Sequence, residues 1–141
     1  MNQQHDEILQ LLEKYKKSVW YKDLDAFLEI YDEDICAYDL WNAWSYEGLE
    51  AWSGMVKDWF SWLNNEKDDV SFHNTVVKSN QDFATLYTFI IYRGLSADEV
   101  ELRRIQNRLT WVLQKKEGVW KVIHEHTSAP AKMDDMKIMT I

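Results

Sequence analysis

The sequence predicts an α+β fold in which a curved antiparallel sheet wraps over three N-terminal helices. Apolar residues recur at helical spacing in three separate segments in the first half of the chain. The second half consists mostly of segments rich in Val, Thr, Phe and Tyr, which favour strands. A run of helices followed by a run of strands is typical of α+β domains, where the helices cover one face of an antiparallel sheet.

The composition indicates one domain, residues 1–141, because one Pro and four Gly leave little room for a flexible linker. A domain of this size buries roughly 70% of the surface that its unfolded chain exposes. The net charge of −8 disfavours nucleic acid and anionic membranes as partners, since phosphate binding needs clustered Lys and Arg. Cys36 is the only cysteine, which excludes an intramolecular disulfide.

The N-terminal residues are polar and acidic, unlike a secretory signal, and no apolar run approaches the ~20 residues of a membrane helix. We therefore expect a soluble, cytoplasmic protein.

The three helices are predicted from their apolar faces and their ends. In the first, from about residue 8 to 20, charged residues alternate with apolar residues at helical spacing. Asp23 is the predicted N-cap of the second helix, whose apolar face extends to Tyr31 and which ends in the acidic residues 32–34. The third helix is predicted over 49–63, with a broad and largely aromatic apolar face.

The strands follow a short strand at 35–40 and an aromatic loop at 41–48. The long strands are predicted over Val70–Ser79, Phe83–Arg93, Val100–Lys115 and Val119–Ser128. Pro130 ends the last of them. The tail, residues 131–141, has apolar residues without a clear period, so it could pair as a further strand, pack on a partner or remain loose.

The last hairpin carries two histidines on one strand. In a regular strand, residues at i and i+2 point to the same face, so His124, His126 and Trp120 are predicted to share one face and Glu125 the other. Two histidines leave a zinc site short of ligands. We therefore expect no metal, and the histidines are predicted to line a pocket or to form a hydrogen-bonded interface pair.

The same hairpin resembles the SnoaL-like branch of the nuclear transport factor 2-like (NTF2-like) superfamily. The matching positions are Arg108, Thr110, Gly118, Trp120, His124, His126, Ser128 and Pro130. The ending is also similar to the association domain of calcium/calmodulin-dependent protein kinase. The resemblance implies a cone-shaped sheet and three helices around an open-ended pocket. Members of this superfamily include isomerases, cyclases and dehydratases as well as non-enzymatic assembly domains, so the fold alone does not decide the function.

The first forty residues resemble ketosteroid isomerase. Tyr15 falls on its oxyanion-hole tyrosine, Asp39 on its general base and Gly48 on the glycine that opens the third helix. The resemblance implies that Asp39 removes a proton next to a carbonyl while Tyr15 donates a hydrogen bond to the developing oxyanion. The third catalytic position falls near Thr110 or Trp111, and neither is acidic, which argues against a steroid isomerase with a full oxyanion hole.

Each candidate also has a structural interpretation. Asp39 could cap the loop that follows its strand, and Tyr15 could be an ordinary core tyrosine. Arg108 and Trp111 differ in parity, so only one of them faces the interior of a regular strand, although a β-bulge would void this argument. The predicted ligand-binding residues are Trp41, Trp59, Arg108, Trp111, His124 and His126.

Two functions follow as expectations. The first is a pocket protein that binds a small apolar or aromatic molecule, with Asp39 and Tyr15 available for isomerisation, cyclisation or dehydration without a cofactor. The second is a non-catalytic binding or association domain. In either case we expect a homodimer or larger homo-oligomer that forms through the exposed sheet face.

Overall fold

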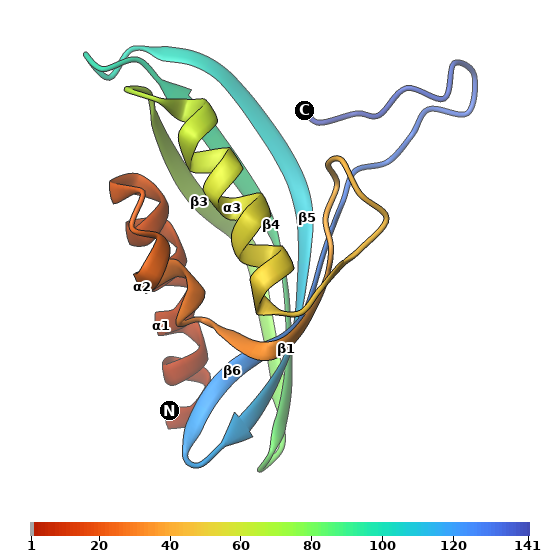
Figure 1. Cartoon of the computed structure of the whole chain (residues 1–141). Coiled ribbons are helices and arrows are strands. Elements are labelled where there is room, and N and C mark those ends of the chain that lie inside the picture. Colours follow the sequence, from red (N-terminus) through yellow and green to blue (C-terminus); the bar gives the residue numbers. More distant parts are fainter. Residues whose placement is uncertain (1) are drawn as a thin grey trace.

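The computed structural model describes residues 2–141 and confirms the α+β class (Figure 1). Six strands form one curved, unclosed sheet in the order β2 (Tyr46–Glu47), β1 (Tyr31–Tyr38), β6 (Val119–Ser128), β5 (Glu101–Lys116), β4 (Phe83–Leu95) and β3 (Lys67–Ser79). The helix α3 lies across the concave side of this sheet, and α1 and α2 lie beside it (Figure 1). The concave side is called the inner face below, and the opposite side the outer face.

The helices begin where the sequence provides caps. The Asn2 side chain accepts hydrogen bonds from the first turn of α1 (Gln3–Tyr21), and Asp23 caps α2 (Leu24–Leu28) by accepting from the Ala26 N–H, as predicted. The third helix, α3 (Leu49–Leu63), follows Gly48, whose φ of 89° lies in the region that glycine tolerates best. None of the helices in the described part of the chain is long and apolar enough to cross a membrane.

The second helix is shorter than predicted, because Tyr31 belongs to β1 (Tyr31–Tyr38) rather than to the helix. Tyr31 pairs in parallel with Val122 of β6, and the Lys116 ammonium lies 3.0 Å from the Asp32 carboxylate. These contacts come from the other end of the chain, so tertiary pairing overrides the helical spacing that extends to Tyr31.

The remaining strands form antiparallel pairs, and their bounds are close to those predicted. They are β2 (Tyr46–Glu47), β3 (Lys67–Ser79), β4 (Phe83–Leu95), β5 (Glu101–Lys116) and β6 (Val119–Ser128). The two-residue strand β2 lies within the predicted aromatic loop. β1 pairs in parallel with β6, which brings the first strand of the chain against the last.

A β-bulge in β6 overturns one prediction. Opposite Val112 and Leu113 of β5 lie His124 and Val122, so Ile123 is the extra residue. The bulge shifts the alternation of faces by one. Trp120 is therefore buried on the inner face, whereas His124 and His126 lie on the outer face, and the prediction that all three share a face is wrong. Glu125 lies on the face opposite the two histidines, as predicted.

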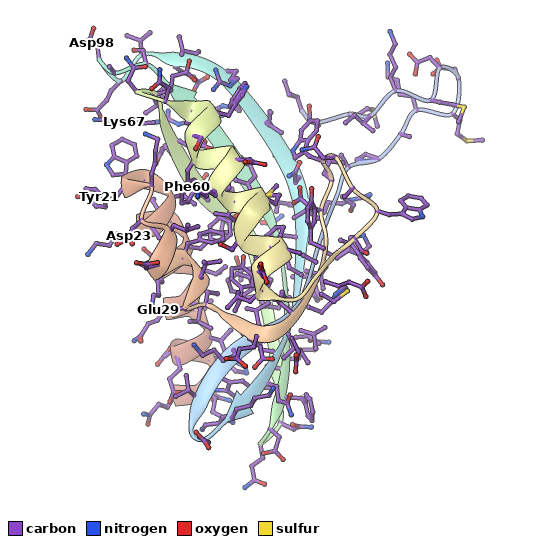
Figure 2. The ribbon with its side chains drawn as sticks, in the orientation of Figure 1. Tyr21, Asp23, Glu29, Phe60, Lys67 and Asp98 are labelled. Carbon is purple, nitrogen blue, oxygen red and sulfur yellow. The ribbon has the colours of Figure 1, made fainter. Side chains whose placement is uncertain are left out.

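The core lies between the helices and the inner face and is largely aromatic. Phe27 of α2 contacts the rings of Tyr15, Tyr31, Trp59 and Phe60, with ring centroids 4.9 to 6.0 Å apart. Phe60 of α3 is buried over the sheet, whereas Tyr21 at the end of α1 is exposed (Figure 2). The many aromatic residues are thus partly explained by this core.

The tail forms a small hairpin that extends away from the sheet (Figure 1). Ala131 and Ile138 form a single bridge, and the Thr140 carbonyl accepts a hydrogen bond from the Gln106 N–H of β5. Most of its apolar side chains stay exposed, Met133 fully. The tail is therefore neither a full strand nor entirely loose.

Candidate functional site

A carboxylic acid lies at the centre of the inner face. Glu125 of β6 is 2% exposed, and its Oε1 accepts hydrogen bonds from the Tyr31 hydroxyl at 2.6 Å and from the Trp111 Nε1–H at 2.8 Å. No ion pair reaches Glu125 among the described residues. Burial raises the pKa of Glu125 to about 7, although the two hydrogen bonds oppose this shift.

Two tyrosine hydroxyls form a pair beside this acid. The Tyr15 and Tyr92 hydroxyl oxygens are 2.8 Å apart, and the Tyr15 ring packs against Trp111 with centroids 6.3 Å apart. Burial, followed by the electrostatic effects of Tyr92 and then of Glu125, raises the pKa of Tyr15 well above its usual value. Both tyrosines therefore keep their protons at neutral pH and can donate hydrogen bonds.

Asp39 lies just beyond β1, at the edge of the same interior. Its Oδ1 accepts from the Thr127 hydroxyl at 3.0 Å, and Thr127 is buried on the inner face. Its Oδ2 accepts from the Trp41 N–H at 3.2 Å, so Asp39 also caps its loop, as its structural interpretation predicts. Burial raises the pKa of Asp39, and the hydrogen bonds from Trp41, Thr127 and Leu40 only partly offset it.

These groups act on one another electrostatically. The charge of Asp39 raises the pKa of both Glu125 and Tyr92, after the larger effect of burial on each. Asp39, Glu125 and the tyrosine pair therefore belong to one interior, where charges interact more strongly than they do in water.

A third acid occupies another part of the inner side. Asp68 of β3 is buried, which raises its pKa to about 6, while the Trp59 side chain and the Arg103 charge oppose the shift. Trp59 of α3 also packs on Tyr92 with ring centroids 5.8 Å apart. Of the predicted ligand-binding residues, Trp59 thus borders the interior.

The structure separates Arg108 from Trp111. Trp111 is fully buried on the inner face, whereas Arg108 is exposed on the outer face, where its Nε–H donates to Ser128 at 3.1 Å. The prediction that Arg108 lines the pocket is therefore wrong, since strand parity places it outside. Its guanidinium also does not pair with Asp39, so it does not lower the pKa of that carboxyl.

The histidines also lie on the outer face, because the bulge in β6 shifts the alternation of faces by one residue. His124 Nδ1 is 2.7 Å from the Cys36 carbonyl oxygen, and the Tyr38 ring packs edge-on against both imidazoles. The prediction that His124 and His126 line the cavity is wrong. Trp41 is 41% exposed in the loop after Asp39, so it lies at the edge of the site rather than within it.

The sequence reasoning missed Glu125, Tyr31 and Tyr92. The alternation of β6 did place Glu125 opposite the histidines, but the histidines were assigned to the interior. One signal in the sequence is Thr127, which lies two residues after Glu125 and therefore on the same face of the strand. Two polar side chains on the inner face, between strands with apolar inner faces, indicate a polar site. In the described residues, no group of three or more His, Cys, Asp or Glu side chains is arranged to hold a metal ion.

The surface has an open groove of about 660 Å³ between α1 and β3. Its lining residues are Asp6, Leu9, Gln10, Leu12, Glu13, Lys16, Ser71, Phe72 and Thr75. None of the site residues above lines it. The groove and the acidic interior are therefore separate features.

The sequence profile of the SnoaL-like domain matches residues 8–132. The chain belongs to the SnoaL-like domain family. The matched range includes every residue of the site above. No curated protein matches the SnoaL-like chain significantly.

Solved structures share the fold. An NTF2-like protein of unknown function from Pseudomonas putida is 26% identical, with a TM-score of 0.84 over 96% of this chain and 92% of that one. Aln2 from Streptomyces is 12% identical, with a TM-score of 0.80 over 91% of each chain. A putative calcium/calmodulin-dependent protein kinase II association domain from Xanthomonas campestris is 16% identical, with a TM-score of 0.75 over 90% and 88%. The last two similarities show the fold alone.

Proposed function

We propose that this SnoaL-like domain binds a small apolar or aromatic carbonyl compound at the inner face of its sheet, where Asp39 acts as the general base. The observation that supports this proposal is the position of Asp39. Its carboxylate touches the buried Thr127 hydroxyl at the edge of an interior that contains phenol hydroxyls and aromatic rings. Aromatic rings together with a few polar groups are the kind of lining that sites for flat apolar molecules have.

The setting of Asp39 favours a base. A carboxylate without a cationic partner in an apolar site is a stronger base than one in water, because burial raises its pKa. Asp39 takes part in none of the salt bridges among the described residues. The hydrogen bonds from Trp41 and Thr127 hold the carboxylate in place without neutralising it.

The tyrosine pair supplies a donor. Two hydroxyls that bond to each other carry two protons and use only one between them, so the second remains for another acceptor. Among the described residues, neither the Tyr15 hydroxyl nor the Tyr92 hydroxyl forms a hydrogen bond other than the one between them. That proton is available to a ketone oxygen as negative charge develops on it.

The step balances as a proton transfer. The bond between hydrogen and the carbon next to the carbonyl breaks, its electron pair forms the enolate, and the proton moves to Asp39. When the Asp39 carboxyl proton exchanges with solvent before a proton returns to the same carbon, the result is hydrogen exchange, and return to a different carbon gives an isomer. No oxidant, metal or cofactor is required.

Deuterium exchange tests this proposal directly. Acetophenone has exchangeable protons only on its methyl group, and NMR in D2O follows their loss. We expect the wild-type protein to accelerate exchange and Asp39→Asn to abolish the acceleration, with Asp34→Asn, an exposed residue of β1, as the matched control. Equal exchange with the wild type and Asp39→Asn would remove Asp39 from the mechanism.

A second candidate function is assembly through the outer face. Tyr38, His126, Thr110 and Tyr87 follow one another across four neighbouring strands, and both tyrosines of this row are exposed. Exposed aromatic rows of this kind are suited to a homodimer interface. Light scattering of the wild type and of Tyr87→Glu tests it, because a wild-type monomer at micromolar concentration excludes the interface.

A further inference from the structure

Asn107 is a buried amide whose oxygen stays unpaired within residues 2–141. It lies on the inner face of β5 with 4% of its surface exposed, and its Oδ1 has no hydrogen-bond partner among the described residues. A buried acceptor without a donor destabilises a protein, and such atoms are rare in folded chains. An amide of this kind therefore indicates a place where another molecule supplies the donor.

The register places Asn107 beside the proposed base. Leu109 of β5 lies opposite Thr127 of β6, and Asn107 precedes Leu109 by two residues, so it points to the same face. Diagonal neighbours of this type have Cα atoms about 7–8 Å apart. Since Thr127 donates to Asp39, the side chains of Asn107 and Asp39 flank the same threonine.

Neither strand beside β5 places a polar side chain opposite Asn107. On the neighbouring strand β4, the residue opposite Asn107 is Ile90, which is fully buried and has no polar side-chain atom. On the other side, β6 ends at Ser128, which pairs with Arg108, so no residue of β6 lies opposite Asn107. The amide therefore lies between an apolar neighbour and the end of a strand.

We propose that Asn107 accepts a hydrogen bond from a hydroxyl group of the compound on which Asp39 acts, so that the substrate is a hydroxylated aromatic or alicyclic ketone. This inference rests on the proposed function and assigns its substrate class. The carbonyl group of the substrate lies at the tyrosine hydroxyls, and its hydroxyl lies at Asn107. A site built to bond a hydroxyl discriminates strongly against an analogue that lacks its hydrogen, because the protein acceptor is then left unpaired.

The test compares hydroxyacetophenone with methoxyacetophenone, each as its meta and para isomers, by isothermal titration calorimetry. The methyl ether keeps the ring and the ketone but removes the donor. We expect the wild type to bind at least one hydroxy isomer about 10-fold more tightly than its ether. The leucine of Asn107→Leu has a similar volume and no acceptor. In this variant the dissociation constants of the hydroxy compound and of its ether should agree within about 2-fold, and both should equal that of the ether with the wild-type protein.

Asn107→Ala provides a second variant, because its smaller side chain cannot clash. Both variants are checked for a cooperative thermal transition, and loss of the hydroxyl preference in either folded variant supports the inference. The inference is overturned if the preference survives in both variants or if the wild type has no preference. Either result is expected if the amide holds only a structural water.

The two proposals fail in different ways. A hydroxyl preference without deuterium exchange refutes the base and leaves Asn107 as the specificity residue. Exchange without a preference refutes the role of Asn107 alone. If none of the four compounds binds to the wild-type protein, the role of Asn107 is overturned, and the exchange of acetophenone alone decides the role of Asp39.

Discussion

The Tyr31 hydroxyl donates to Glu125 across 2.6 Å, although the two residues are 94 positions apart. This bond ties the first residue of β1 to the middle of β6, and the same carboxylate oxygen accepts from Trp111 of β5. Three strands therefore meet at one buried acid. Because both donors are neutral, the bonds position the carboxyl without providing a positive charge.

Tyr31→Phe removes one of the two donors to Glu125 and keeps the ring. Because Trp111 still donates to the same oxygen, only the net contribution of one hydrogen bond is lost, and we expect the free energy of unfolding to fall by about 0.5–1.5 kcal/mol. Urea denaturation measures it, with Tyr21→Phe as the control, since Tyr21 is exposed. A fall in Tyr31→Phe no larger than in the control would mean that the bond contributes nothing.

Glu125→Gln should change how stability depends on pH. The pKa of Glu125 is about 7 in the folded protein against an ordinary value of 4.5, so the folded state holds its proton over a range in which the unfolded state has released it. The contribution of Glu125 to the free energy of unfolding is therefore at its full value below the ordinary pKa. This contribution falls as pH rises towards 7 and does not change further at higher pH. The loss in the wild type is about 3 kcal/mol by this linkage.

Denaturation at about pH 5 and about pH 8 measures the difference, because the glutamine side chain does not titrate. Between these values the wild type should lose more stability than Glu125→Gln. Parallel losses in the two proteins would contradict the raised pKa of this acid.

The exchange rate should rise with pH as Asp39 loses its proton, since only the carboxylate is a base. Thr127→Val removes the hydroxyl that bonds to the charged form of Asp39, so the pKa of Asp39 should rise further. We therefore expect the midpoint of the rate profile to move to higher pH in Thr127→Val. An unchanged midpoint with a lower plateau would show that Thr127 only maintains the packing.

The outer face should not take part in ligand binding. Arg108→Ala and His126→Ala alter residues that point away from the interior, and we expect the dissociation constant for hydroxyacetophenone to stay within about 2-fold of the wild type. Calorimetry checks this, with Asn107→Leu as the positive control. A larger effect from either variant would place the binding site on the outer face instead.

Removal of the tail after Pro130 should cost little stability. The hairpin is held by one isolated bridge and by a backbone bond to Gln106, and its apolar side chains are mostly exposed. We expect a change in the free energy of unfolding below about 1 kcal/mol, measured by urea denaturation. A larger loss in a protein that light scattering shows to be oligomeric would instead assign the tail to an interface between subunits.

Local signals predicted most of the fold. Asp23 is an N-cap by its residue type and position, and the apolar face of α3 follows from helical spacing, so both were readable without any distant contact. The intact helical spacing predicts that Tyr31 belongs to the second helix. The strand it joins is defined by Val122, which the local sequence does not reveal.

The site was only half predictable, for a similar reason. Tyr15 and Asp39 were identified through a resemblance, and the structure brings both to one interior. The predicted face of the histidines is wrong because a bulge of one residue, Ile123, reverses the faces of the strand after it, and nothing in the sequence marks this bulge. That reversal also moved Glu125 into the interior.

The parallel pairing of β1 with β6 also determines when the site can form. The bonds Tyr31–Glu125, Asp39–Thr127 and Leu40–Thr127 join positions 94, 88 and 87 residues apart, so none exists until the last strand has been synthesised. Long-range pairings of this kind slow folding, because the chain must be ordered before they contribute. Until then β1 exposes an unpaired edge, and Tyr31 and Ile35 remain uncovered. The nascent chain is therefore most open to aggregation just before its final hairpin is complete.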